Sequence, residues 1–216
     1  MLDVPNVDRQ HAGERVDRQR RRREQTRREI LDAAWQVARE QGLTGLTLRD
    51  VADRVGMRAP SLYSHFDSKH AIYDAMYGEA WSAYEQAVRP GRDTLTGDLR
   101  AAAQHITRTF FDFAVADPVR YQLMNQRVIP GFEPSAESYA PAVRVLEESY
   151  AIAAERGVAD PDDVAILLAL MGGLIDQQLA NDPGGDRFSR LLARAVDMWC
   201  DGVGIAPNTS TQEATS

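Results

Sequence analysis

Residues 44–72 contain two short helical patterns separated by a glycine, and this stretch constrains the fold more than any other part of the sequence. Thr47 opens the first pattern and Asp50 follows three residues later, so the Thr hydroxyl can accept a hydrogen bond from a first-turn amide while the carboxylate reaches back. Apolar residues then recur at helical spacing until Gly56, where the end of a helix favours a left-handed residue. The pattern is that of a helix-turn-helix.

The second helix of this motif begins near Pro60, where a missing backbone N–H costs nothing. Leu62 and Phe66 form its inward face. In helix-turn-helix proteins the second helix lies in the major groove of DNA, with its N-terminal residues at the base edges. The side chains that we expect on this outward face are Arg58, Ala59, Ser61 and Ser64.

The segment that runs from Gly42 through LTLRDVADRVGMRAPSLYSHFDSKHAIYDAM resembles the N-terminal DNA-binding domain of the TetR (tetracycline-repressor-like) family of bacterial regulators. The resemblance covers roughly residues 26–77, and its most specific part is LYSHF followed by Lys69. It implies an all-α protein whose C-terminal domain binds a ligand and pairs two chains. It also implies contacts with the phosphate backbone by Thr47, Tyr63, His65 and Lys69.

The start of the second helix departs from the family pattern. Arg58 stands where the family often has Ser or Thr, and Ala59 and Pro60 stand where many relatives have longer polar side chains. Arg58 can contact a guanine edge and its two neighbours a thymine methyl, but Arg58 can alternatively contact phosphate. Because each base contact contributes only about 1–3 kcal/mol of discrimination, we expect two copies of the chain on an operator with two half-sites.

The formal net charge of −7 is distributed unevenly along the 216 residues. Residues 1–70 hold 14 basic and 11 acidic side chains, whereas the remainder holds 11 basic and 21 acidic ones. An acidic body is repelled by phosphate, so only the N-terminal part is expected to bind nucleic acid, although its small excess of positive charge also fits an ordinary solvated surface. Lys69, the single lysine, stands at a helix N-terminus, where the helix dipole disfavours a cation. A DNA phosphate bound nearby would stabilise the ammonium there, so Lys69 is a candidate phosphate contact.

Composition divides the chain into four parts. Residues 1–19 are predicted to be a disordered polar tail, 20–70 the DNA-binding domain, 71–204 a helical ligand-binding and dimerisation domain, and 205–216 a second disordered tail. The arginines between 20 and 28 either form a basic arm that contacts DNA or belong to a frayed, solvated helix end. Apolar periodicity predicts an all-α fold of about nine helices near 20–41, 48–55, 58–66, 68–88, 94–116, 119–128, 136–156, 161–180 and 187–203.

Aromatic and sulfur-containing side chains are frequent between residues 81 and 150. In one interpretation they fill the core of the second domain. In the other, some of them line an apolar cavity suited to a small lipophilic or aromatic ligand. The candidates for such a ligand site are Trp81, Tyr84, His105, Phe110, Phe113, Tyr121, Met124 and Tyr150.

The last two predicted helices form a hairpin. The first of them is apolar nearly all round and contains Gly172 and Gly173, each of which costs about 1 kcal/mol relative to Ala. Glycine lets a second backbone approach closely, which would offset that cost. We therefore predict a two-fold interface in which two hairpins form a four-helix bundle. The alternative is a kink in a monomeric core. The interface candidates are Leu168, Gly172, Gly173, Ile175, Leu191, Leu192, Ala195 and Trp199.

Other classes of protein find little support in the sequence. The four histidines have no metal-ligand spacing, and no phosphate-binding glycine loop or nucleophile elbow is present, so we expect no metal, no cofactor and no enzyme activity. No apolar stretch reaches the roughly 18 residues of a membrane span, and no secretory signal is apparent, so a cytoplasmic protein without membrane contact is expected.

The sequence as a whole predicts a homodimeric transcriptional repressor whose partners are operator DNA and a small-molecule effector. A transcriptional activator stays open as an alternative. So does a helical interaction protein of the same fold that has lost operator binding.

Overall fold

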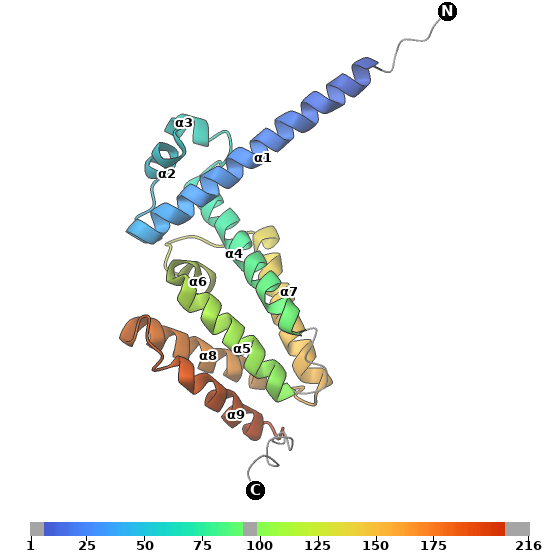
Figure 1. The fold of residues 1–216 in the computed structure, drawn as a ribbon, viewed down its shortest axis with the longest axis vertical. Helices are drawn as coiled ribbons and strands as arrows, with labels where there is room; N and C mark the ends of the chain where they lie inside the picture. Colours follow the sequence, from blue (N-terminus) through green and yellow to red (C-terminus); the bar gives the residue numbers. More distant parts are fainter. Residues whose placement is uncertain (1–6, 93–98, 206–216) are drawn as a thin grey trace, which may run out of the picture. The chain divides into compact units, whose positions relative to one another are not determined.

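The computed structural model describes residues 7–92 and 99–205, and side chains within 17–89 and 99–205. These ranges contain nine α-helices, one short 3₁₀ helix and no strand, which confirms the all-α prediction (Figure 1). The helices are α1 (Val7–Gln41), α2 (Leu48–Val55), α3 (Ala59–Leu62), α4 (Lys69–Arg92), α5 (Leu99–Ala116), α6 (Pro118–Asn125), α7 (Ala136–Glu155), α8 (Pro161–Asn181), η1 (Ser189–Leu191) and α9 (Leu192–Gly202).

The chain packs as two compact units, and the division falls inside α4. Unit 1 holds the chain up to Met76 together with Val128–Glu133, and unit 2 holds Tyr77–Arg127 and the chain from Pro134 onward. Sequence analysis placed this division at residue 70. The first turns of α4 belong to unit 1 because the Tyr73 hydroxyl donates a hydrogen bond to the carbonyl of Leu43, and its ring packs against Phe132.

The helix-turn-helix forms at the predicted residues. Thr47 caps α2, since its hydroxyl accepts a hydrogen bond from the Asp50 amide at 3.1 Å and donates to the Asp50 carboxylate at 2.6 Å. Gly56 ends the helix with a φ of 78°, a conformation that side chains with a Cβ disfavour. The core beneath the motif consists of side chains that are at most 1% exposed, namely Ile30, Ala34, Val37, Leu46, Val51, Ala52 and Leu62.

Helix α1 begins at Val7, so residues 7–19, which we predicted to be disordered, are helical. Arg, Gln, Glu and Ala, which are good helix formers, make up seven of the thirteen residues of this stretch. Ion pairs one turn apart, between Asp17 and Arg21 at 2.7 Å and between Arg20 and Glu24 at 3.9 Å, further favour the helix at residues 17–24. In Figure 1 this part of α1 extends past α2 and α3. Residues 1–6 lie outside the described part.

Unit 2 is built around α5, which contacts α6, α8 and α9. Arg100 links α5 to α9 through hydrogen-bonded ion pairs with Asp197 at 2.8 Å and Asp201 at 2.7 Å. Beside this link lies a buried cluster that includes Leu99, Ala103, Ala153, Val164, Val196, Trp199 and Cys200. These contacts fix the hairpin of α8 and α9 against the rest of the unit.

Several helix ends in unit 2 differ from prediction. Helix α4 continues to Arg92 instead of ending near residue 88, because Pro90 interrupts only one turn of backbone hydrogen bonding. Helix α6 ends at Asn125, after which residues 128–133 join unit 1. The predicted start of the next helix near residue 94 and the predicted tail beyond Ile205 lie outside the described residues.

Candidate DNA-binding and ligand-binding sites

Helix α3 and the residues around it present the side chains that sequence analysis assigned to DNA. Leu62 is fully buried and anchors the turn, while Pro60 lies in its first turn. Arg58, Pro60 and Ser61 are exposed, and Tyr63 is 52% exposed. Ala59 is half-buried. The helix itself is shorter than predicted, a single turn, yet it leaves this face open to a groove.

Two arginines of α1 hold the C-terminal end of this segment. Arg23 donates a hydrogen bond to the carbonyl of Ser64 at 3.2 Å, and Arg27 donates to the carbonyl of His65. The guanidinium of Arg27 also lies 4.0 Å from the ring centroid of Phe66. Sequence analysis treated the whole arginine run as an arm or a frayed end, whereas these two members orient the recognition segment. Others in the run, such as Arg22, are exposed.

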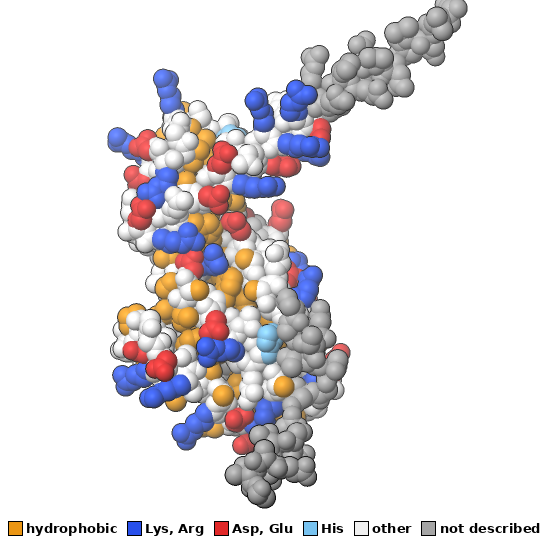
Figure 2. Space-filling model, viewed as in Figure 1, with side chains coloured by type: hydrophobic (Ala, Val, Ile, Leu, Met, Phe, Trp, Pro, Cys, Tyr) orange, Lys and Arg blue, Asp and Glu red, His pale blue; other side chains and the backbone are white. Residues whose placement is uncertain are grey.

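The predicted phosphate contacts already have roles inside unit 1. Lys69 is the first residue of α4, and its ammonium donates to the carbonyl of Thr44 at 3.4 Å and lies 5.4 Å from the Tyr73 ring centroid. Thr47 is exposed while its hydroxyl caps α2. His65 is half-buried, and its Nδ1 makes no hydrogen bond within the described part of the chain. On the face in Figure 2, basic side chains with acidic ones between them surround α1–α3.

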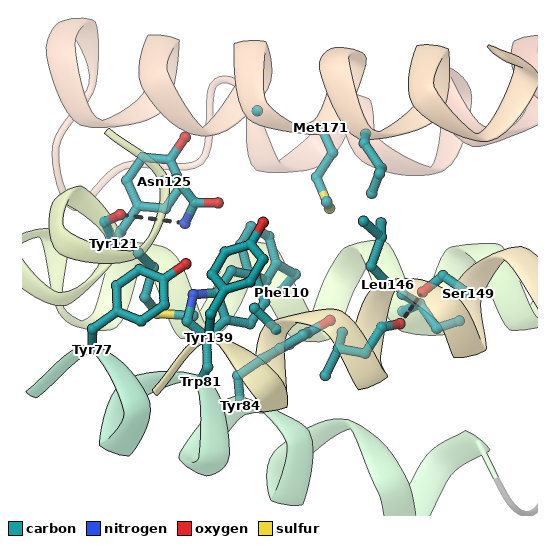
Figure 3. Close-up of a pocket in the computed structure, with 16 residues that line it drawn as sticks. Tyr77, Trp81, Tyr84, Phe110, Tyr121, Asn125, Tyr139, Leu146, Ser149 and Met171 are labelled. Atoms are coloured by element: carbon teal, nitrogen blue, oxygen red, sulfur yellow. Dashed lines mark hydrogen bonds between the residues drawn. The ribbon is translucent and has the colours of Figure 1, made fainter. Parts of the chain in front are cut away.

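Unit 2 contains a cavity of about 330 Å³ between α4, α5, α6, α7 and α8 (Figure 3). None of its 16 lining side chains carries a charge at neutral pH. Aromatic rings dominate one end, where Tyr84 and Phe110 pack edge to face at 4.8 Å between ring centroids. The lining residues are Tyr77, Trp81, Tyr84, Ile106, Phe110, Tyr121, Met124, Asn125, Tyr139, Ala142, Val145, Leu146, Ser149, Leu168, Met171 and Gly172.

Five of the eight predicted ligand residues line this cavity, namely Trp81, Tyr84, Phe110, Tyr121 and Met124. The other three lie outside its lining. His105 faces Thr109 at 3.5 Å, Phe113 packs against Tyr84 and Arg120, and Tyr150 packs against the buried cluster that contains Trp199.

Helix α7 contributes to this cavity through residues other than the predicted Tyr150. Residues 139, 142, 145, 146 and 149 all line it and recur at helical spacing, which is the signal that could have identified them. Sequence analysis also missed Tyr77, which stacks on Tyr139 with a ring separation of 6.1 Å.

Two tyrosine hydroxyls of the cavity are held in their protonated form. Burial raises the pKa of Tyr77 to about 12, with the neighbouring Tyr139 adding to the shift and Trp81 opposing it. Burial likewise raises the pKa of Tyr121, whose hydroxyl donates to the Asp176 carboxylate at 3.0 Å. At neutral pH both side chains are therefore neutral hydrogen-bonding groups.

The candidates for chain pairing fall into three groups. Ile175, Leu192 and Trp199 are buried within their own chain. Leu168 and Gly172 line the cavity. Gly173, Leu191 and Ala195 are at least partly exposed. Three large apolar side chains of the same two helices are exposed and were not among the predicted residues, namely Ile166 (54%), Leu170 (43%) and Met198 (64%).

Comparison with known proteins identifies the family. The family described as bacterial regulatory proteins, tetR family, matches residues 30–76. The class A tetracycline repressor from transposon 1721 of Escherichia coli is 27% identical over an alignment of 186 residues, and the match covers 78% of each chain. The segment 30–76 thus belongs to the tetR family of bacterial regulatory proteins, and the chain resembles TetR-family regulators over most of its length.

Further TetR-family relatives extend the likeness. The transcriptional repressor KstR2 of Rhodococcus jostii is 32% identical over 114 residues, and this match spans 47% of the present chain and about half, 53%, of that repressor. The crystal structure of FadR from Bacillus subtilis in complex with stearoyl-CoA superposes with a TM-score of 0.63 over 83% of the present chain and 98% of that one, at 13% identity. This last likeness concerns the fold alone.

We predict that Tyr77 makes the stability of the protein fall at alkaline pH. Its pKa is higher in the folded chain than the ordinary value of 10.0, so its contribution is complete below pH 10 and is lost as the pH rises toward 12. Tyr77→Phe should remove part of that decline, on the order of 1 kcal/mol in the free energy of unfolding after allowance for solvent screening. Urea unfolding between pH 9 and pH 11.5 measures it.

The control for this measurement is Tyr63→Phe, because Tyr63 lies on the surface of unit 1. An identical slope in the native protein and in Tyr77→Phe would contradict the prediction.

Proposed function

We propose that this TetR-like protein is a cytoplasmic, homodimeric repressor that leaves its operator when a small uncharged ligand enters the cavity of unit 2. The proposal is carried by one observation. An exposed helix-turn-helix face in unit 1 and a charge-free cavity in unit 2 share α4, with Lys69 at its start and Tyr77, Trp81 and Tyr84 in its later turns.

The two units are joined by a second covalent route. Helix α6 supplies Tyr121, Met124 and Asn125 to the cavity and is followed two residues later by Val128–Glu133, which pack in unit 1. Phe132 in this segment contacts His70 and Tyr73 of α4 at 5.9 and 5.8 Å between ring centroids. A ligand that displaces α4 or α6 therefore acts on residues that are anchored in the DNA-binding unit.

The proposed release follows from this coupling. Two recognition helices of a dimer bind successive major grooves about 34–36 Å apart. A ligand that favours a different tilt of α4 changes this separation, and operator affinity falls because the liganded conformer no longer fits both half-sites.

The exposed apolar residues of α8 and α9 support pairing of two chains. Ile166, Leu170 and Met198 would be costly to leave in water, whereas a second copy would bury them. The sequence predicts no stretch long enough for a membrane span, yet α8 is long and apolar enough by length and composition. One such helix is weak evidence for a membrane, and α8 packs against α5, α7 and α9. Gly173 is exposed on the same helix and would permit close approach of the partner backbone.

We expect substitutions on the DNA-binding face to separate two kinds of contact. Lys69→Ala and Tyr63→Phe should weaken binding to all sequences alike, and Lys69→Ala should lower the slope of affinity against salt concentration by about one. Arg58→Ala should relax specificity at one base pair by about 1–3 kcal/mol. Binding to upstream intergenic DNA across a salt series, with nonspecific competitor, measures all three.

The matched control for these variants is Arg190→Ala, which removes an exposed arginine of unit 2. A uniform loss for Arg58→Ala would reassign Arg58 to phosphate. Weak, unselective binding of the native protein at every salt concentration to genomic fragments would contradict the regulator itself and favour an interaction protein.

A charge on the exposed apolar face should prevent pairing. Leu170→Glu or Met198→Glu would bury a carboxylate without a counter-charge in the proposed interface, so we expect monomers in analytical ultracentrifugation and a large loss of operator affinity. Gln86→Glu, which adds the same charge at an exposed position on α4, is the control and should stay dimeric. Variants that remain dimers would place the interface elsewhere.

The effect of ligand on DNA binding must be reciprocal. If a compound that binds the purified protein lowers operator affinity by a given factor, operator DNA must lower the affinity for that compound by the same factor, about 5- to 150-fold for typical coupling. Calorimetric titration of the compound with and without operator DNA measures this factor. Equal ligand affinity in both titrations would rule out release by α4 tilting.

A further inference from the structure

A second, smaller chamber adjoins the cavity of unit 2. Its volume is about 40 Å³, and Leu99 and Trp199 line it but not the main cavity. It shares four lining residues with the main cavity, namely Ile106, Ser149, Leu168 and Met171. These four side chains form the boundary between the two spaces.

The walls of the second chamber offer nothing polar to a ligand. Its two hydroxyls are already used, since Thr107 donates to the carbonyl of Ala103 at 2.7 Å and Ser149 donates to the carbonyl of Val145 at 2.9 Å. The indole N–H of Trp199 donates to the carbonyl of Asp163 at 2.7 Å. The rest of the chamber wall is aliphatic and aromatic, so it would contact a hydrocarbon part of a ligand favourably.

The opposite end of the main cavity has a different chemistry. Figure 3 shows Tyr77, Tyr121, Asn125 and Tyr139 gathered there, away from Leu146 and Ser149. These are neutral hydrogen-bonding groups between aromatic rings. A carboxylate or phosphate placed among them would lose its hydration without meeting a cation from the lining, which is strongly unfavourable.

We propose that the ligand is a neutral amphiphile, with an oxygen-bearing aromatic ring in the main cavity and a short aliphatic chain that reaches the second chamber between Ile106 and Met171. This inference rests on the proposed function of the cavity as the effector site. Met171 suits such a boundary because its unbranched thioether side chain adapts its shape to what passes it.

The volume of the chamber limits the chain. A water-sized group needs roughly 10–15 Å³ of cavity volume, so the chamber accommodates about three methylene groups. Each methylene transferred from water to an apolar wall raises affinity about fourfold. Affinity should therefore rise over about three successive methylenes and then level off or fall.

Phenyl n-alkyl ketones, from acetophenone to decanophenone, are the probes for this inference. They are titrated by calorimetry into the full chain without DNA, beside phenylalkanoic acids of equal length. The expected result is a rise of about fourfold per methylene that ends after about three steps. The carboxylates are expected to bind at least a hundredfold more weakly than the matching ketones.

A pair of buried alanines provides the matched variants. Ala103→Leu fills the second chamber and should remove the dependence on chain length, so that the ratio between long and short ketones approaches one. Ala142→Leu reduces the main cavity and should weaken all ketones by a similar factor. Thermal melting shows whether each variant is folded. If a variant is unfolded, the ketone titrations on the native protein alone test the proposal.

Three results would overturn the proposal: affinity in the native protein that does not depend on chain length, carboxylates that bind as tightly as the ketones, or no binding of any ketone. Because these titrations contain no DNA, they are independent of operator binding. A protein that binds the ketones but no operator would contradict the proposed function and leave the ligand class standing.

Discussion

The continuity of helix α4 is the constraint on which the rest of the structure depends. A single run of backbone hydrogen bonds carries Ile72, Tyr73 and Met76, which are buried in unit 1, and then Tyr77, Trp81 and Tyr84, which line the cavity of unit 2. A helix transmits displacement along its length because bending it costs hydrogen bonds. The stacking of Tyr77 on Tyr139 then ties the first turn of α4 in unit 2 to α7. In the function that we propose, a ligand that reorganises these rings therefore acts on the helix that begins after the helix-turn-helix.

The helix-turn-helix was predictable because its signals are local. The cap at Thr47, the left-handed Gly56 and the apolar spacing between them act within a few residues of one another, and each formed where the sequence placed it. The length of the N-terminal helix was underestimated, because the sequence predicts its start near residue 20 and it begins at Val7. Apolar periodicity detects a helix through its buried face, whereas the sequence of residues 7–19 carries no such apolar pattern although the chain is helical there.

The cavity could be predicted only in part, because membership in its lining depends on how five helices pack. Trp81 and Phe113 are indistinguishable as aromatic residues of apolar helix faces, yet one lines the cavity and the other packs under the guanidinium of Arg120. The same limit applies to the arginines of α1. Their charge suggested DNA, but only the fold shows that Arg23 and Arg27 lie beside the carbonyls of Ser64 and His65 and bind those instead.

Helix α8 shows why an apolar stripe alone does not identify an interface. It is apolar nearly all round because it serves several surfaces: Ile175 packs in the core, Met171 lines the cavity, and Ile166 and Leu170 face outward. The glycine pair divides in the same way, with Gly172 in the cavity wall and Gly173 on the exposed side. A Cβ on Gly172 would meet no atom within 4 Å, so the absence of a side chain there adds volume to the cavity and is not required by packing. The helix cost of two adjacent glycines is thus matched by cavity volume at Gly172 and, in the dimer that we propose, by close approach of the partner chain at Gly173.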